Sequence, residues 1–217
     1  MQEPSNDNPE ISESERLSKL RRSKSQQPPT LGRQTLSTLA LFAAAVLVAF
    51  TIKAYVIQPY IVDGESMQPT LLNGDRLIVD KIPRTLARID GHQYVPKRND
   101  IVIFNQSNLP NYVGTKQLIK RVIGLPGDRV VVGDGHITIY NSANPKGFNP
   151  DTPDGYPLNA QITSGNIDLT LSAHQIFVCG DNRANSEDSR YFGPVSLNNV
   201  VGKLVLRIMP FSQAKKF

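Results

Sequence analysis

The sequence has a single cysteine and no dense cluster of charge of one sign. Because Cys179 is the only cysteine, no disulfide can form within the chain. The 24 Lys and Arg residues against 19 Asp and Glu residues give a net charge of +5, but the basic side chains are scattered and form no patch that could follow a phosphate backbone. No HExxH helix, CxxC pair or other group with metal-ligand spacing occurs either. These absences argue against nucleic acid as a partner and against a metal site.

Long apolar runs are also scarce, and only one is long enough to span a membrane. Residues 34–52 are 19 consecutive uncharged residues. At about 1.5 Å per residue, a helix of this length crosses a hydrocarbon layer of about 30 Å. The run therefore predicts a transmembrane helix over 35–52. A buried soluble helix and a cleavable signal peptide are the alternatives, but a signal peptide would start near residue 1 and have a shorter apolar stretch.

The segments on either side of this run differ in charge. Residues 1–34 hold six basic and five acidic side chains and few aliphatic ones, which predicts a disordered tail. The basic residues precede the span and only Lys53 follows it closely, so the positive-inside rule places the tail in the cytoplasm. No second run of spanning length occurs. Residues 53–217 are therefore expected to lie outside the cytoplasm.

The remainder of the chain has the pattern of short β-strands. Runs rich in Val and Ile alternate with turn signals, and Asp134-Gly135 between two of them is typical of a tight hairpin turn. Residues 141–170 are rich in Asn, Pro, Gly, Asp and Ser, which predicts a small, loop-dominated insertion. The expected fold is a mainly β domain of antiparallel strands. The predicted strands are 76–81, 101–104, 117–123, 129–132, 136–140, 175–179 and 200–209.

The candidate nucleophile is Ser66, in the segment GESMQPTL. A serine between Gly64 and the turn-forming Pro69 could present its hydroxyl and its own backbone N–H to a substrate carbonyl, as an oxyanion hole requires. An ST-turn that only caps a loop is the alternative for this segment. A Ser-His pair is not expected, because none of the three histidines lies beside a glycine-flanked serine: His92, His136 and His174.

Lys120 interrupts the apolar run QLIKRVIG and is the candidate base. Leu118 and Val122 share its face of the predicted strand. Burial between them would disfavour the ammonium and lower the lysine pKa, so that the amine accepts the Ser66 proton near neutral or mildly alkaline pH. Arg121 would stay charged in any environment, so only Lys120 suits this role. Charged residues that protect a sheet edge are the alternative explanation.

A third polar segment, GDNRANSEDSR at 180–190, belongs to the candidate site. It contains one alanine and otherwise only glycine and polar or charged residues, so a solvated loop is one explanation. If it folds against Lys120, Ser186 could orient the amine, while Asp188 and Arg190 could form a bidentate ion pair that fixes the loop.

These segments, in this order and behind an N-terminal anchor, resemble the signature boxes of type I signal peptidases. SMQPTL at 66–71 resembles the nucleophile box, and GDRLIVDK at 74–81 resembles the strand that follows it. KRVIGLPGD at 120–128 resembles the lysine box, and GDNRANSEDSR resembles the closing box. The resemblance runs from about residue 55 to the C-terminus. It implies the antiparallel β core that signal peptidases share with repressor-type proteases.

The resemblance implies a serine endopeptidase that works without a cofactor and removes signal peptides from exported preproteins after small residues, in an Ala-x-Ala pattern. Ser66 would be the nucleophile and one oxyanion donor, and Lys120 the general base. Ser186 would orient that lysine, and Asp188 and Arg190 would form a structural ion pair.

One position departs from part of the family. Some members carry, two residues before the nucleophile, a serine whose hydroxyl completes the oxyanion hole. Gly64 stands there in this chain, as in other members, and its backbone N–H is the candidate second donor.

The substrate is expected to lie extended and to add a strand through main-chain hydrogen bonds. Besides signal peptides, membrane lipid is the expected partner, in the inner (cell) membrane or in a thylakoid-type membrane. The residues expected to contact the substrate are Tyr60, Ile61, Val62, Asp63, Met67, Gln117, Leu118 and Ile119.

Two other functions fit parts of the pattern. A self-cleaving Ser-Lys protease of the repressor type shares the β core, but the membrane span and the missing helix-turn-helix argue against it. A non-catalytic, membrane-tethered β module that binds extracytoplasmic peptides is the alternative from a different class. The joint presence of Ser66, Lys120 and Ser186 favours the enzyme, because a degenerate relative would usually lack one of them.

Overall fold

The computed structural model describes residue 14 and residues 31–107, 109, 112–151 and 162–217. The chain divides into two compact units, residues 1–49 and residues 50–217. The prediction of a disordered tail over 1–34 is wrong for residues 31–34, which are helical. Most of the remaining tail lies outside the described residues, so its disorder stays a prediction.

Helix α2 (Leu31–Tyr55) contains the long apolar run. It extends past the predicted end of the span at residue 52, and its stretch Thr35–Tyr55 has a mean hydropathy of 2.2 with none of its apolar window buried. The Ala- and Leu-rich composition favours a helix. A helix that is apolar on all sides and of this length has the composition and length of a membrane span.

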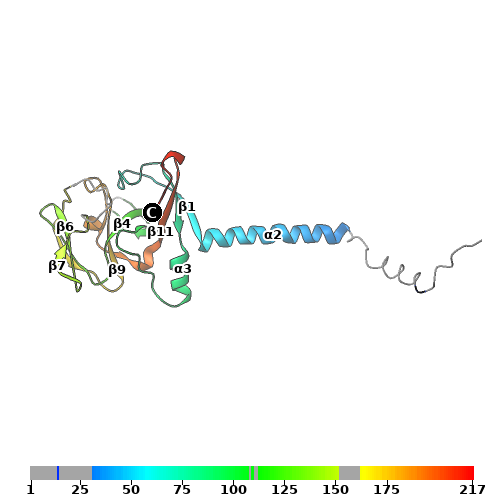
Figure 1. Cartoon of the computed structure of the whole chain (residues 1–217), viewed down its shortest axis with the longest axis horizontal. Helices are drawn as coiled ribbons and strands as arrows, with labels where there is room; N and C mark the ends of the chain where they lie inside the picture. Colours follow the sequence, from blue (N-terminus) through cyan, green and yellow to red (C-terminus); the bar gives the residue numbers. More distant parts are fainter. Residues whose placement is uncertain (1–13, 15–30, 108, 110–111, 152–161) are drawn as a thin grey trace, which may run out of the picture. The chain divides into compact units, whose positions relative to one another are not determined.

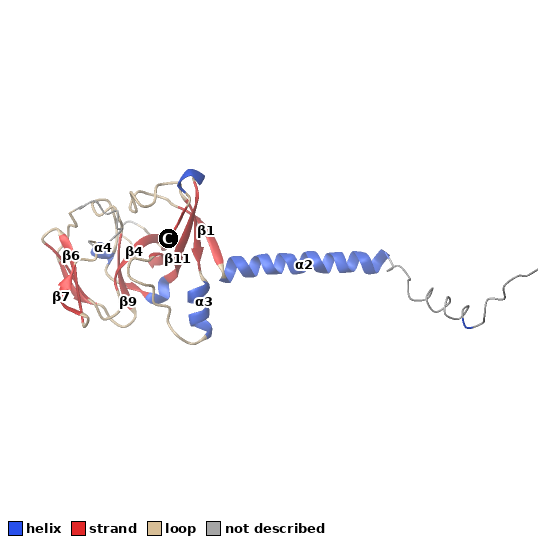
Figure 2. Ribbon diagram, in the orientation of Figure 1, coloured by secondary structure: helices blue, strands red, loops and turns tan. Residues whose placement is uncertain are grey.

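Residues 50–217 form two antiparallel β-sheets (Figures 1 and 2). The eight-stranded sheet has the order β1-β2-β11-β3-β4-β9-β10, with β12 paired to β11. Its strands are β1 (Ile57–Ile61), β2 (Arg76–Asp80), β3 (Ile101–Ser107), β4 (Thr115–Gly124), β9 (Gln175–Cys179), β10 (Val195–Ser196), β11 (Val200–Met209) and β12 (Lys215–Lys216).

The second sheet has four strands in the order β7-β6-β5-β8. Asp134 and Gly135 join β5 to β6 with φ angles of 50° and 81°, which confirms the predicted tight turn. The strands are β5 (Arg129–Gly133), β6 (His136–Asn141), β7 (Asn144–Phe148) and β8 (Ile167–Thr170). Strands β7 and β8 therefore lie inside the segment 141–170, where the sequence predicts mainly loop, and residues 152–161 of that segment are outside the described part.

Short helices connect the strands of the large sheet. They are α3 (Ile82–Ile89), α4 (Ser189–Phe192), η1 (Leu197–Asn199) and η2 (Phe211–Gln213). None was predicted, although the spacing of Ile82, Leu86 and Ile89, with Pro83 in the first turn, is a helical signal.

The prediction of a mainly β, antiparallel domain behind one apolar helix is confirmed. Alternate residues point to opposite faces of each strand, so the Val and Ile runs supply buried faces to both sheets. Ile123 and Phe177 of the large sheet share one core cluster with Val130 and Ile139 of the small sheet. Each such buried side chain contributes about 1.5–3 kcal/mol. This cluster fixes the small sheet on the β4 and β9 side of the large one.

Candidate active site

Ser66 lies in the loop between β1 and β2. The two ends of this loop are joined by backbone hydrogen bonds, from Val62 N to Asp75 O at 2.9 Å and from Gly74 N to Val62 O at 2.9 Å. Met67 is 1% exposed and packs in the core beneath the loop. The serine is thus held between a closed loop base and a buried neighbour, which fixes its position.

Lys120 extends from β4 to the same point. Its Nζ lies 2.8 Å from Ser66 Oγ and 3.1 Å from Ile119 O, and the residue is only 4% exposed. Lys120 and Arg121 are both buried, and their side chains contact Ser66 Oγ and Asp181. Neither cation is exposed as a charge that protects a sheet edge, so that alternative explanation is wrong.

The environment of the amine alters its proton affinity. Burial lowers the pKa of Lys120 from 10.5 to about 8. The negative charges of Asp188 and Glu187 oppose this change, and the positive charge of Lys116 adds to it. A substantial fraction of the amine is therefore neutral near pH 8, and a neutral amine can accept the Ser66 proton.

The segment 180–190 folds against the loop of Ser66 and is not a solvated loop. Asn182 N donates to Ser66 O at 3.0 Å, and Asn182 Nδ2 donates to Glu65 O at 3.3 Å. An ideal Cβ on Gly180 would lie 2.4 Å from Ser66 O, so the close approach requires glycine. The backbone of Ser66 is thereby held by the segment 180–190 as well as by the hydrogen bonds at the base of its own loop.

Asp188 and Arg190 form the bidentate pair that the sequence predicts. Arg190 Nε lies 2.9 Å from Asp188 Oδ1, and Arg190 Nη2 lies 2.8 Å from Asp188 Oδ2. The same carboxylate accepts from Gly180 N at 3.0 Å and is fully buried. It therefore connects the two ends of the segment.

Ser186 does not make the hydrogen bond to Lys120 expected from the sequence. It is 7% exposed, and its Oγ has no hydrogen-bond partner among the described residues. It lies against Gly180, because an ideal Cβ there would be 2.2 Å from Ser186 Oγ. Its hydroxyl is thus buried beside the loop of Ser66, and its role in orienting the lysine stays a prediction.

Sequence reasoning missed two further ion pairs that anchor the same segment, the first of them buried. Arg121 Nε lies 2.8 Å from Asp181 Oδ1, and Arg183 pairs with Asp151. Asp181 and Arg183 are 0% and 2% exposed. The signal for the first pair was Arg121 itself, since an arginine in an apolar strand needs a buried carboxylate partner.

The predicted oxyanion donors differ in their availability. Gly64 N donates to Asn73 Oδ1 at 3.0 Å, so the candidate second donor is already engaged in this structure. Ser66 N has no acceptor among the described residues. The backbone N–H of Ser66 is the donor that remains open to a substrate carbonyl.

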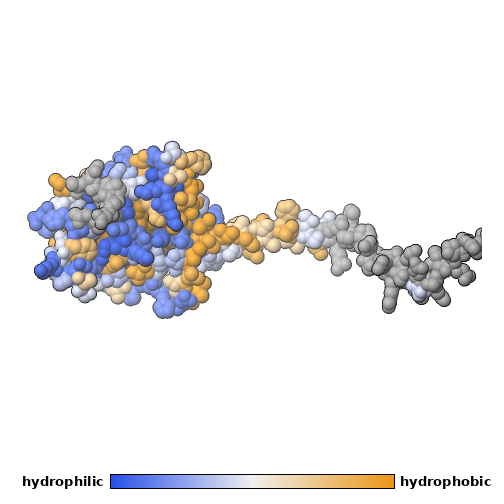
Figure 3. Space-filling view, viewed as in Figure 1, coloured by the Kyte–Doolittle hydropathy of each residue, from blue (hydrophilic) through white to orange (hydrophobic). Residues whose placement is uncertain are grey.

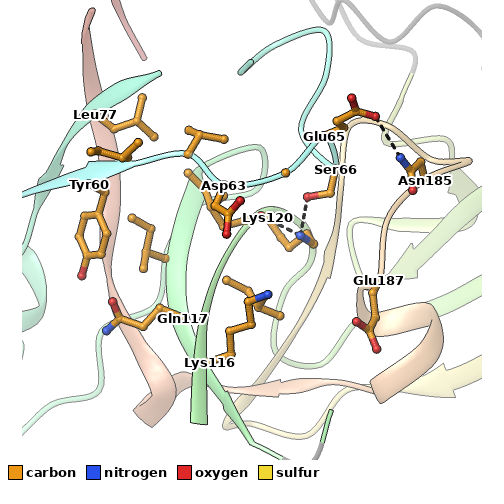
Figure 4. A pocket seen from close by; sticks show the side chains of 16 residues that line it. Tyr60, Asp63, Glu65, Ser66, Leu77, Lys116, Gln117, Lys120, Asn185 and Glu187 are labelled. Atoms are coloured by element: carbon orange, nitrogen blue, oxygen red, sulfur yellow. Dashed lines mark hydrogen bonds between the residues drawn. The ribbon is translucent and has the colours of Figure 1, made fainter. Parts of the chain in front are cut away.

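A cleft of about 340 Å³ runs along the Ser66–Lys120 pair (Figure 4). Strand β1 pairs only with β2, and β4 pairs with β9 only from Arg121 onward. Within the described residues, the edge of β1 and the first half of β4 therefore each leave main-chain groups unpaired beside the cleft. Such edges can accept an added strand.

The residues that line the cleft include all but one of those predicted to contact substrate. Met67 is the exception, because its side chain fills the core below the loop. The predicted residues present in the lining are Tyr60, Ile61, Val62, Asp63, Gln117, Leu118 and Ile119. Charged side chains of the lining that were not predicted are Glu65, Lys116 and Glu187.

The histidines take no part in this cleft. His136 Nδ1 contacts Asp134 O at 3.1 Å, and His174 Nδ1 contacts the side chain of Gln93. His92 lines a separate cavity. Among the described residues there is also no group of three or more His, Cys, Asp or Glu side chains that could hold a metal.

The chain is similar to several known proteins. Residues 35–209 match the family model described as signal peptidase, peptidase S26. A signal peptidase I of Bacillus caldolyticus is 36% identical over 163 residues, which cover 70% of this chain and 79% of that protein. A signal peptidase I of Leptolyngbya laminosa is 34% identical over 155 residues, covering 70% of this chain and 68% of that protein. A crystal structure of a signal peptidase I from Enterococcus faecalis V583 has a TM-score of 0.39 at 30% identity, covering 51% of this chain and 97% of that chain.

Proposed function

Since this chain belongs to the signal peptidase family, peptidase S26, we propose that it cleaves signal peptides from exported preproteins with Ser66 as nucleophile and Lys120 as general base. The family assignment identifies a serine peptidase. The observation that carries the residue roles is the 2.8 Å separation of Lys120 Nζ and Ser66 Oγ around a buried amine.

The chemistry follows from this pair. Neutral Lys120 accepts the proton of the Ser66 hydroxyl as Oγ attacks the scissile carbonyl. The tetrahedral oxyanion is stabilised by Ser66 N–H, and Gly64 N–H becomes a second donor if the substrate displaces Asn73. The protonated lysine then gives its proton to the leaving amine, which yields an acyl-enzyme and the new N-terminus. Water, deprotonated by the same amine, hydrolyses the ester and releases the signal peptide.

The substrate lies between the unpaired edges of β1 and β4. Main-chain groups near Tyr60–Asp63 and Gln117–Ile119 bond the extended peptide, and alternate side chains point into the cleft. Leu77, Ile103 and Ile119 contribute apolar side chains to its lining. We expect small residues at the first and third positions before the cleaved bond, the Ala-x-Ala pattern.

The helix α2 anchors the enzyme in the membrane. The excess of Lys and Arg before the span orients the N-terminus to the cytoplasm and residues 53–217 to the opposite side. The membrane that holds α2 would be a bacterial inner membrane or a thylakoid-type membrane. The catalytic unit then meets a signal peptide whose apolar segment is embedded in the same bilayer, which raises the effective substrate concentration.

A cleavage assay tests the proposal. The full-length protein in detergent is incubated with a preprotein, alongside the variants Ser66→Ala and Lys120→Ala. We expect both variants to lose at least about a thousandfold in kcat, because the members of a catalytic pair act as a unit. A control variant, His136→Ala, should retain full activity because His136 lies on the small sheet.

Two outcomes would reject the proposal. Cleavage by Lys120→Ala at more than a small fraction of the wild-type rate would exclude the dyad. Absence of cleavage by the wild type, with retained binding of signal peptides, would instead favour the non-catalytic peptide-binding module.

A further inference from the structure

Helix α3 exposes its apolar side chains. Ile82, Leu86 and Ile89 follow the i, i+4, i+7 spacing of one helical face and are 40%, 54% and 74% exposed. A helix on a water-facing surface would direct polar residues outward. In α3 three apolar side chains face outward, while on the opposite face Arg84 is half-buried and Arg88 is exposed. An exposed apolar face on a short helix rich in arginine is typical of a membrane–water interface.

The position of α3 agrees with that environment. Thr85 Oγ1 donates to Tyr55 O at 2.9 Å, and Lys81 N donates to Val56 O at 2.8 Å. Tyr55 is the last residue of the candidate membrane span. Hydrogen bonds thus hold α3 beside the point where the span ends. Figure 3 shows hydrophobic residues gathered over the part of the domain that contains β1 and α3.

A basic cavity of about 200 Å³ lies along the Arg84 side of α3. Among the described residues, no carboxylate lines this cavity and neither arginine forms an ion pair. Arg84 reaches only Asn198 O, at 3.5 Å. Burial, and then the charge of Arg88, lowers the pKa of Arg84. The lining residues are Arg84, Arg88, His92, Gln93, Tyr94, Leu197 and Asn198.

Positive charge in this cavity is therefore not neutralised by the protein. Two arginines four residues apart on a helix repel each other, which costs stability unless an anion lies between them. The planar guanidinium binds phosphate oxygens in a bidentate manner. A phosphate group has the size, charge and acceptor geometry that the cavity requires.

We propose that α3 binds the headgroup of an anionic phospholipid, with Arg84 and Arg88 on the phosphate and the Ile82–Leu86–Ile89 face among the acyl chains. A helix with its side chains is about 10–12 Å wide, and an interfacial helix sinks about 5–10 Å into the headgroup boundary. The face of α3 opposite its apolar side chains, which carries the two arginines, therefore remains at the depth of the lipid headgroups. Because the span ends beside α3, membrane lipid supplies the phosphate in preference to a soluble anion.

Lipid binding is measured by native mass spectrometry on the full-length Ser66→Ala protein, titrated with phosphatidylglycerol or phosphatidylcholine. This background separates lipid binding from cleavage, so the outcome stands whether or not the proposed peptidase activity is correct. We expect phosphatidylglycerol to bind at least tenfold more tightly than phosphatidylcholine. The double variant Arg84→Gln/Arg88→Gln should bind phosphatidylglycerol about 30-fold more weakly, at about 1 kcal/mol for each basic side chain.

A matched control removes the same charge elsewhere. Arg129→Gln/Lys146→Gln alters two exposed cations of the small sheet and should leave lipid binding unchanged. Leu86→Gln/Ile89→Gln should weaken phosphatidylglycerol binding through the apolar face while both arginines remain. Equal binding of the two lipids, or an equal loss in the control variant, would overturn the proposal. Binding of inorganic phosphate with no weakening by Leu86→Gln/Ile89→Gln would assign the cavity to a soluble anion and would also overturn it.

Discussion

Lys120 shows how the surroundings of one residue change its proton affinity. A lysine on an exposed strand would be charged at any physiological pH, with a pKa near 10.5. In this fold β4 carries it inward until it is 4% exposed, and Ser66 Oγ is 2.8 Å from its nitrogen. Burial disfavours the charged form, so the same side chain can serve as the base that we propose.

The pH dependence of cleavage should report this amine. With the pKa of Lys120 lowered to about 8, kcat/KM should fall about tenfold for each pH unit below 8 and level off above it. Glu187→Gln removes a charge that raises this pKa, so the rising limb should move to lower pH. Lys116→Gln removes a charge that lowers the pKa, so the limb should move to higher pH. A limb unaffected by both substitutions would mean that another group titrates.

Replacing Lys120 by an apolar residue should remove activity but increase the stability of the fold. A lysine whose pKa is about 8 in the folded chain and 10.5 when unfolded opposes folding fully below pH 8, and the opposition fades as pH rises to 10.5. We expect Lys120→Met to raise the free energy of unfolding at pH 7 by on the order of 2 kcal/mol. The gain should disappear above about pH 10.5. Urea denaturation across this range measures it, and a Lys120→Met protein less stable than wild type at pH 7 would contradict the burial cost.

At the scale of elements, the site depends on how closely the segment 180–190 approaches the loop of Ser66. Gly180 is the contact point. An added Cβ would lie 2.2 Å from Ser186 Oγ and 2.4 Å from Ser66 O. Both distances are shorter than those that real Cβ atoms make. The backbone angles of Gly180 lie outside the left-handed region, so an alanine could adopt them without strain. The effect of the substitution would therefore come only from the short contacts of its Cβ.

Gly180→Ala should therefore displace the nucleophile. We expect at least a hundredfold loss of kcat, because a shift of about 1 Å in a reacting group costs on that order. Gly133→Ala is the control, since its Cβ meets no atom within 4 Å and its backbone is also outside the left-handed region. The measurement is preprotein cleavage beside a thermal unfolding curve for each variant. A Gly180→Ala enzyme with near-normal kcat would show that the contact does not position Ser66.

The same segment shows what sequence patterns can and cannot predict. Local periodicity was enough to place the Val- and Ile-rich strands, and the odd lysine in an apolar run was enough to single out Lys120. Burial of Asp181 and Arg183 depends on partners far along the chain, Arg121 and Asp151, so the polar run alone leaves a solvated loop open as an explanation. Likewise, no local signal indicates that Gly64 N–H bonds to Asn73.

Strand order is a second property without a local signal. Strand β11, near the C-terminus, lies between β2 and β3, and this pairing brings the β1 and β4 edges to either side of the cleft. Because register and order follow from the packing of whole faces, single strands do not specify them. The cleft could be predicted only through the resemblance to a known family.

At the scale of the whole molecule, anchor and chemistry are separable, since the Ser66–Lys120 pair, the cleft and both sheets all belong to the unit 50–217. Deleting residues 1–52 should therefore leave kcat/KM for a short soluble peptide within about twofold of the full-length value. Cleavage of a preprotein embedded in proteoliposomes should fall by about 10²-fold or more, because the shared bilayer no longer concentrates enzyme and substrate. The two rates are measured on the same truncated preparation, with its Ser66→Ala version as the blank. Equal losses on both substrates would mean that the apolar helix supports the fold of the catalytic unit, and equal retention would mean that membrane attachment does not aid the encounter.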